Sequence, residues 1–199
     1  MRLHNYLEDV LGSKVKVKVL RELFKYHPKP YTIRELAASI NGVTHTGVRK
    51  VLGDLLSSNL IRVEHHGQSN LITLNDKSEI YGELRNLFAL ESKTLYNLTH
   101  ELKKLHNDIV SCAMFGSVAR SEERPDSDID VLFITDDREA VQKFVADKSH
   151  FFTNRYGNVV MPYIMSRSEF VRKRNTPFVK GILENYKLIK GEDLWKLIR

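Results

Sequence analysis

An apolar run at residues 109–115 is the feature that most limits what this chain can fold into. A run of this kind is typical of a strand buried on both faces of a sheet. Gly116 and Ser117 end the run, and a second apolar strand follows over 131–134. A third strand is predicted over 159–165, with helices over 139–152, 168–174 and 177–184. The second half of the chain is therefore expected to be a mixed sheet flanked by helices, within an α+β protein.

The first 75 residues have a different pattern, in which short helices precede a hairpin. Helices are predicted over 4–11, 14–26, 32–41 and 44–58, and Thr32 and Glu35 have the spacing of a capping box. Alternating segments at 60–65 and 70–74, joined around Gly67, predict a β-hairpin. Residues 1–75 hold 11 Lys and Arg against 6 Asp and Glu, whereas residues 76–199 hold 20 against 19. The basic surplus favours contact with nucleic-acid phosphates.

This order of helices and hairpin resembles a winged-helix module over about residues 12–75. In such modules the last helix enters the major groove and the wing touches the DNA backbone. The residues that the resemblance places against double-stranded DNA are Thr44, His45, Thr46, Arg49 and Lys50, with His66, Gly67 and Gln68 at the wing tip. The alternative is a small domain that binds another protein, with its charges only solvated.

A helical stretch is predicted from about residue 76 to 107. Its apolar residues recur at alternating spacings of three and four, which is a heptad pattern that only Glu91 interrupts. The seam consists of Tyr81, Leu84, Phe88, Leu95, Leu98, Leu102 and Leu105. It predicts a homodimer through this helix, and the alternative is a connecting helix packed on its own domains.

Two carboxylates lie at the start of the second apolar strand. Asp128 and Asp130 are two residues apart, so on a strand both side chains project from the same side. Two like charges this close repel each other unless a cation lies between them. Magnesium or manganese, bound by carboxylates and by substrate phosphates, meets that requirement.

The end of the first strand offers a place for phosphates. Gly116 lets the backbone approach a ligand closely, and a helix starting here would offer its free amides and the Ser117 hydroxyl to an anion. Arg120 adds a positive charge one turn later. Positioning and charge neutralisation are most of what phosphoryl chemistry requires.

Gly116-Ser117-x-Ala119-Arg120 followed by Ser127-Asp128-Ile129-Asp130 resembles the signature of minimal nucleotidyltransferases of the DNA polymerase beta superfamily, over about residues 94–192. The resemblance implies that Asp128 and Asp130 are catalytic and hold the metal. It implies that the nucleoside triphosphate (NTP) is bound by Gly116, Ser117, Arg120 and Ser127. The implied reaction is transfer of a nucleoside monophosphate from an NTP to an acceptor, with release of pyrophosphate.

The chain departs from this family at one point. Active members place a third carboxylate on the next strand, but residues 158–165 contain no acid, and Glu169 beyond them is expected in a helix-start or surface position. Pro162 indicates a strand at the edge of the sheet. The alternative function is therefore a weak or inactive nucleotidyltransferase fold that senses a nucleotide, as a transcriptional regulator or as an antitoxin-like protein beside a toxin partner.

The expected domains are a winged helix over 1–76, a linking helix over 77–107 and a nucleotidyltransferase-like domain over 108–199. No stretch approaches the length of about 18 apolar residues that spans a bilayer, and the first 18 residues lack the apolar run of a signal peptide, so we expect a cytoplasmic protein without a membrane partner. Cys112, the single cysteine, lies in the apolar run and is expected to be a buried, inert thiol.

Overall fold

The computed structural model describes residues 3–67, 69–105, 109–124 and 126–199, except for the side chains of residues 9 and 10. The chain divides into two compact units. Asn5–Ser92 form the N-terminal unit, and Met1–His4 together with Lys93–Arg199 form the C-terminal unit.

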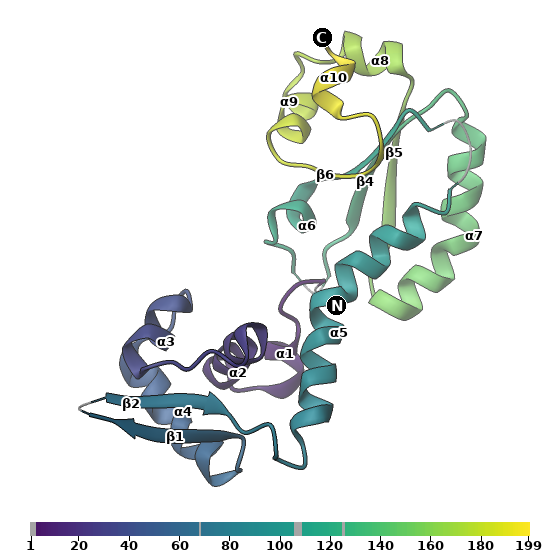
Figure 1. Ribbon diagram of the computed structural model, residues 1–199. Coiled ribbons are helices and arrows are strands. Elements are labelled where there is room, and N and C mark those ends of the chain that lie inside the picture. The colour runs from purple at the N-terminus through teal and green to yellow at the C-terminus, as the bar shows by residue number, and fades with distance from the viewer. Residues whose placement is uncertain (1–2, 68, 106–108, 125) are drawn as a thin grey trace. The chain divides into compact units, whose positions relative to one another are not determined.

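The N-terminal unit has the predicted order of helices and hairpin (Figure 1). Its helices are α1 (Leu7–Leu11), α2 (Lys14–Tyr26), α3 (Ile33–Ser39) and α4 (His45–Ser57), and its strands are β1 (Ile61–His66) and β2 (Ser69–Leu74). The capping box is confirmed, because Thr32 Oγ1 accepts from the Glu35 amide and the Glu35 side chain accepts from the Thr32 amide. A bridge between Tyr31 and Ile72 joins the hairpin to the segment before α3.

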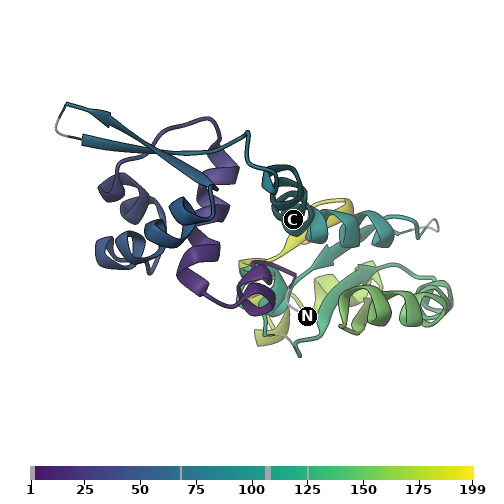
Figure 2. The same cartoon turned by 90° about the horizontal axis from the view of Figure 1, so that it is seen from below.

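Apolar residues at helical spacing form the interior of this unit. Leu23 of α2, Leu36 of α3 and Leu55 of α4 are almost fully buried, together with Ile61 and Ile72 of the hairpin. Figure 2 shows the hairpin projecting beyond the helices that it packs on. Leu56 of α4 is the exception among the apolar residues of this helix, because it is 51% exposed. Position 56 lies one residue past the buried Leu55, so the helix turns it out toward solvent.

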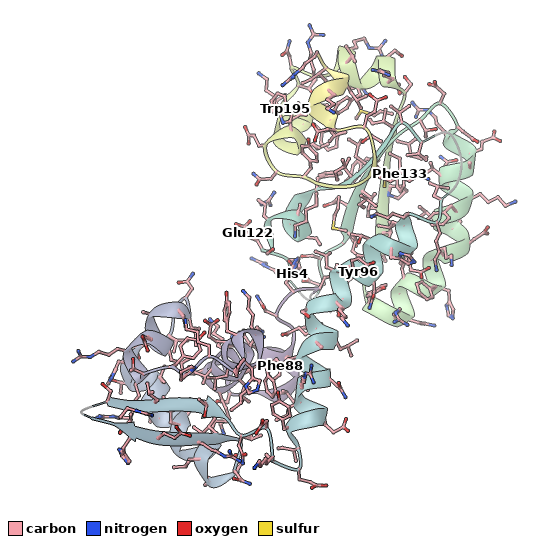
Figure 3. All side chains as sticks on the ribbon, viewed as in Figure 1. His4, Phe88, Tyr96, Glu122, Phe133 and Trp195 are labelled. Atoms are coloured by element: carbon pink, nitrogen blue, oxygen red, sulfur yellow. The ribbon has the colours of Figure 1, made fainter. Side chains whose placement is uncertain are left out.

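Helix α5 (Tyr81–Leu102) is shorter than predicted and runs from one unit into the other. Its first part packs in the N-terminal unit, where the rings of Phe88 and Phe24 stack with centroids 5.1 Å apart (Figure 3). Its last turns pack in the C-terminal unit, where Leu98 and Leu102 join the core. The predicted heptad seam is thus largely used inside the chain, and the homodimer stays a prediction.

Glu91, the residue that interrupts the heptad, is buried for a specific reason. Its carboxylate accepts hydrogen bonds from Arg21 Nε at 2.7 Å and Nη2 at 3.0 Å, and from the Leu7 amide at 2.8 Å. Arg21 Nη1 also donates to Glu8 at 2.8 Å. This ion-pair network ties α1 and α2 to α5 within the N-terminal unit.

The C-terminal unit contains the predicted mixed sheet. Its strands are β3 (Ser111–Met114), β4 (Ile129–Ile134), β5 (Val160–Met165) and β6 (Lys187–Gly191), in the order β5-β4-β3-β6. Strands β4 and β5 are parallel and are joined through α7 (Arg138–Tyr156), whereas β3 is antiparallel to both of its neighbours. Short helices complete the unit: α6 (Gly116–Arg120), α8 (Arg167–Arg172), α9 (Pro177–Glu184) and α10 (Leu194–Leu197).

Both faces of the sheet are covered, as the apolar run predicts (Figure 1). Phe133, Val131 and Cys112 point to the face covered by α5 and α7, and Leu132 and Ala113 point to the face covered by α8, α9 and α10. Cys112 is buried, as predicted, and burial raises the pKa of its thiol to about 12.

Pro162 lies on an edge strand, as predicted. The carbonyls of Val159 and Met165 accept hydrogen bonds from β4, so the alternation of the ladder turns the backbone of residue 162 outward. Its missing N–H therefore costs no bond to β4 and leaves the edge a poor template for another strand. None of the described helices is both long and apolar enough to cross a membrane.

Candidate functional site

The site begins where β3 ends beside the start of β4. The Phe115 amide donates to the Asp130 carbonyl at 3.0 Å, which holds the turn after β3 against β4. Gly116 follows with φ +70°, a conformation that favours glycine. A Cβ at this position would lie 2.4 Å from Asp130 Oδ2, so only glycine fits beside the carboxylate as it stands.

The structure brings Asp128 and Asp130 together at this end of the sheet. Asp130 is half-buried in β4 on the same side as Leu132, and Asp128 is exposed just before the strand. Burial and then the charge of Asp128 raise the pKa of Asp130, although the Tyr163 hydroxyl and the charge of Arg120 oppose that rise. The two carboxylates therefore repel each other, as neighbouring like charges do, and a cation between them would relieve that repulsion.

Tyr163 of β5 is a neighbour of the carboxylates that the sequence did not single out. Burial, followed by the charges of Asp130 and Asp128, raises the pKa of its hydroxyl. In the parallel register Asp130 lies opposite Met161 and Leu132 lies opposite Tyr163, so Met161 and Tyr163 share the side of the sheet that carries Asp130. A tyrosine and a methionine thus occupy the positions of β5 from which a third carboxylate could reach the pair.

Glu169 does not supply that third carboxylate. It closes a capping box at the start of α8, where its Oε2 accepts from the Ser166 amide at 3.0 Å. The same oxygen pairs with Arg138. This confirms the expected helix-start position. Among the described residues, no group of three or more His, Cys, Asp and Glu side chains could hold a metal ion.

The loop between α6 and β4 is held by contacts that position the carboxylates. Ser127 Oγ accepts from the Arg124 amide at 2.8 Å, and the Ser127 carbonyl accepts from Asn158 Nδ2 at 2.8 Å. Asn158 is 4% exposed and precedes β5, so it ties the loop to that strand. Arg120 Nε donates to Glu122 at 2.8 Å rather than to either aspartate.

Glu123, in the same loop, is a buried acid anchored by the start of the chain. Its Oε1 accepts from the amides of Leu3 and His4, at 3.0 and 2.8 Å, and lies 2.7 Å from His4 Nδ1. Burial alone would raise the pKa of Glu123, but the hydrogen bonds from His4 outweigh it and the pKa is lowered. Long-range pairing of this kind has no signature in a single sequence.

Three aromatic rings line the same side of the sheet beside the carboxylates. The ring of Tyr163 lies 5.1 Å from that of Phe115 and 5.4 Å from that of Phe178 in α9. Phe115 is buried, whereas Tyr163 is 36% and Phe178 41% exposed. The Tyr163 ring is therefore held in place by its neighbours while remaining open to solvent.

The N-terminal unit exposes a second group of predicted site residues. His45, Thr46, Arg49 and Lys50 are all exposed on α4, and Thr44 is its N-cap, with Oγ1 accepting from the Gly47 amide at 3.1 Å. His66 is exposed at the end of β1, with Nε2 3.8 Å from a Glu64 carboxylate oxygen. Gln68 lies outside the described residues.

The mixed sheet with its carboxylate pair and its glycine turn defines the class of the C-terminal half. The profile of the nucleotidyltransferase domain matches residues 95–192, and the chain belongs to this family. A curated relative from Methanocaldococcus jannaschii, named "Putative protein adenylyltransferase MJ1305", is 31% identical over 117 residues, which cover 54% of this chain and 80% of the relative.

Solved structures resemble parts of the chain only distantly. AF1382 from Archaeoglobus fulgidus is 14% identical and matches 51% of this chain and 99% of its own, with a TM-score of 0.34. A toxin–antitoxin structure with AMP-PNP is 16% identical, over 50% and 80%, with a TM-score of 0.37. TrmBL2, an archaeal chromatin protein, is 14% identical, over 90% and 72%, with a TM-score of 0.31. TM-scores this low carry no conclusion on function.

Proposed function

We propose that the C-terminal unit binds a nucleoside triphosphate with a divalent cation and transfers its nucleoside monophosphate to a hydroxyl, releasing pyrophosphate. The observation that carries this proposal is the close approach of Asp130 to Gly116, next to Asp128. The two carboxylates and the backbone turn at Gly116 thus lie side by side, as the binding of a metal ion together with a triphosphate requires. The name of the Methanocaldococcus jannaschii relative supports ATP as the nucleotide and a protein as the acceptor.

The residues present fit a magnesium or manganese ion. Asp128 and Asp130 would hold it, since carboxylate oxygens are the ligands these ions prefer. The repulsion from Asp128, which adds to burial in raising the pKa of Asp130, would be relieved. When bound, the ion supplies charge neutralisation for the transferred phosphate. Gly116 and Ser117 would face the triphosphate, and Arg120 would add its charge, while Ser127 shapes the loop through its bond to the Arg124 amide.

The test is incubation with magnesium and ATP labelled at the α-phosphate, with release of pyrophosphate measured beside transfer of label. Asp128→Asn and Asp130→Asn should abolish both. Asp136→Asn is the matched control, because Asp136 is exposed near the other end of β4 and should leave both unchanged. Equal loss in all three variants, or none in any of them, would refute the proposal.

A second candidate function is nucleotide binding without turnover. It is favoured by the residue type found on β5 next to the two aspartates. Tyr163 stands where a third carboxylate could reach the pair, and no acid occurs in the strand. The chain would then be a regulator or an antitoxin-like partner that responds to a nucleotide. Binding of a nonhydrolysable triphosphate, lost in Asp130→Asn, together with no pyrophosphate release by the unchanged protein, would favour this candidate.

For the N-terminal unit we propose double-stranded DNA binding by a winged-helix arrangement. The support is the exposed, basic part of α4 next to the hairpin. Arg49 and Lys50 are both exposed on the helix, and His66 is exposed on the hairpin. Phosphate contacts release counterions, so affinity should fall steeply as salt is raised.

Alanine at either basic residue of α4 tests this. Arg49→Ala and Lys50→Ala should each weaken binding of duplex DNA and reduce the slope of log affinity against log salt by about one. Lys77→Ala, an exposed lysine outside α4 and the hairpin, is the control and should leave the slope unchanged. Affinity that does not respond to salt would rule out these contacts.

A further inference from the structure

Tyr163 lies beside the groups that an acceptor of a nucleotidyl transfer must reach. It is on the strand next to that of Asp130, on the same side of the sheet, and its ring packs on Phe115 directly before Gly116. Asp130 in turn lies against the turn at Gly116. An acceptor hydroxyl has to be close both to a base and to the α-phosphate of the triphosphate. If the triphosphate lies along Gly116 and Ser117 with its cation at the aspartates, the Tyr163 side chain is on the side of the sheet from which its hydroxyl can meet both conditions.

The side chains around Tyr163 restrict the motion of its ring but leave part of it exposed to solvent. Phe115 and Phe178 flank it at centroid distances of 5.1 and 5.4 Å, which restricts the ring without burying it. Because 36% of the residue is exposed, the phenol can be reached by a bound nucleotide. A third carboxylate, which would serve an acceptor arriving from outside, is missing from the strand that supplies the phenol instead.

We propose that this chain nucleotidylates itself on Tyr163, with the phenol taking the place of an external acceptor. This inference rests on the proposed transferase function and names its substrate. The phenolic oxygen forms a bond to the α-phosphorus, and the bond from that phosphorus to the bridging oxygen of the β-phosphate breaks. Pyrophosphate leaves with the electron pair, and the phenolic proton passes to the Asp130 carboxylate and then to water.

A consequence separates this reaction from ordinary turnover. Once Tyr163 carries the nucleotide it has no proton left to donate to Asp130 and no free hydroxyl. The reaction therefore stops after one nucleotide per chain, and pyrophosphate release is a burst that ends near one equivalent. A single self-modification at Tyr163 also accounts for an intact glycine turn and aspartate pair in a site that lacks the third carboxylate.

The experiment uses the full chain with magnesium and ATP, and reads the product by mass spectrometry of the intact protein and of its peptides. One adenylyl group on Tyr163 is expected. Tyr163→Phe keeps the ring and its packing but should carry no adenylyl group. Tyr96→Phe, which changes a 66% exposed tyrosine on α5, is the matched control and should be labelled like the unchanged protein.

A second readout does not depend on catalysis. In protein with isotope-labelled tyrosine rings, the NMR signal of Tyr163 is assigned by its loss in Tyr163→Phe. This signal should shift when the protein binds magnesium together with an ATP analogue that cannot be cleaved between its α- and β-phosphates. The signal of Tyr96 should not shift. Adenylylation at another residue, or equal labelling of Tyr163→Phe, would overturn the inference but leave the transferase function standing. Failure of the analogue to bind at all would overturn both.

Discussion

Replacing Gly116 with alanine is a direct test of the site, because two separate costs can be worked out for it. The first is conformational. At φ +70° a residue with a Cβ lies in the left-handed region, which costs about 1–2 kcal/mol. At about 5 °C per kcal/mol for a unit of this size, the melting temperature should fall by roughly 5–10 °C.

The second cost is steric and falls on Asp130. The added Cβ would lie 2.4 Å from Oδ2, and ordinary contact begins at 3.4 Å, so that oxygen has to move by about 1 Å. The atom that must move is the end of a side chain, so the backbone can stay in place and the displacement is concentrated on the carboxylate. A misplacement of about 1 Å at a reacting centre can lower a rate about 100-fold.

Two other glycines calibrate the result. In Gly181→Ala the new Cβ has no atom within 4 Å and the glycine is in α9, so the variant should be as stable as the unchanged protein or more stable by up to about 1 kcal/mol. In Gly191→Ala the Cβ would lie 2.2 Å from the Val110 carbonyl oxygen, with φ +87°. Backbone cannot give way as a side chain can, so this variant should lose more stability than Gly116→Ala.

The assays are thermal unfolding followed by circular dichroism and, on the folded variants at low temperature, release of pyrophosphate and binding of a triphosphate. Gly116→Ala should lose far more activity than stability, and Gly191→Ala should show the opposite. A Gly116→Ala variant with full activity would contradict the predicted displacement of the Asp130 carboxylate. So would a loss of activity that only matches the fraction of the variant that is unfolded.

Three further outcomes concern stability. Asp130→Asn should raise the melting temperature at neutral pH, because the pKa of Asp130 is raised in the folded state and its ionisation therefore opposes folding. Below about pH 4 the carboxyl is protonated, so the gain should vanish there. A lower melting temperature of the variant at pH 7 would contradict this. Glu123→Gln should lower the urea midpoint of unfolding at neutral pH, because the lowered pKa of Glu123 means that its ionised form stabilises the fold. The difference between the two proteins should shrink as the pH falls below about 4 and the carboxylate is protonated. A difference that does not depend on pH would contradict this prediction. Glu91→Ala should destabilise the N-terminal unit by about 2 kcal/mol, because Arg21 keeps only its bond to Glu8 and the Leu7 amide loses its acceptor. The exposed Glu79→Ala should cost less than about 0.5 kcal/mol, and equal effects in denaturant titrations would disprove the role of the network.

Local patterns in the sequence determined most of the elements and half of the site. The apolar run predicted a sheet covered on both faces, and the capping box at Thr32 and the edge position of Pro162 were confirmed. Asp128 and Asp130 could be paired from their spacing alone, because a strand places alternate residues on one side. The close approach of Asp130 to Gly116 depends on how β3 and β4 pair, so the spacing of the residues alone did not determine it.

Only the tertiary structure decided which groups from distant parts of the chain meet. Tyr163 at Asp130, Asn158 at the Ser127 carbonyl and the first residues at Glu123 are contacts across strands and loops, and no spacing in the sequence encodes them. The same holds for the heptad seam. Its pattern indicates that one side of α5 is buried, but it does not indicate which elements that side packs against. The periodicity of apolar residues predicts which side chains are buried, because burying apolar surface is favourable. Which residues cover those side chains depends on how all the elements of the fold pack together.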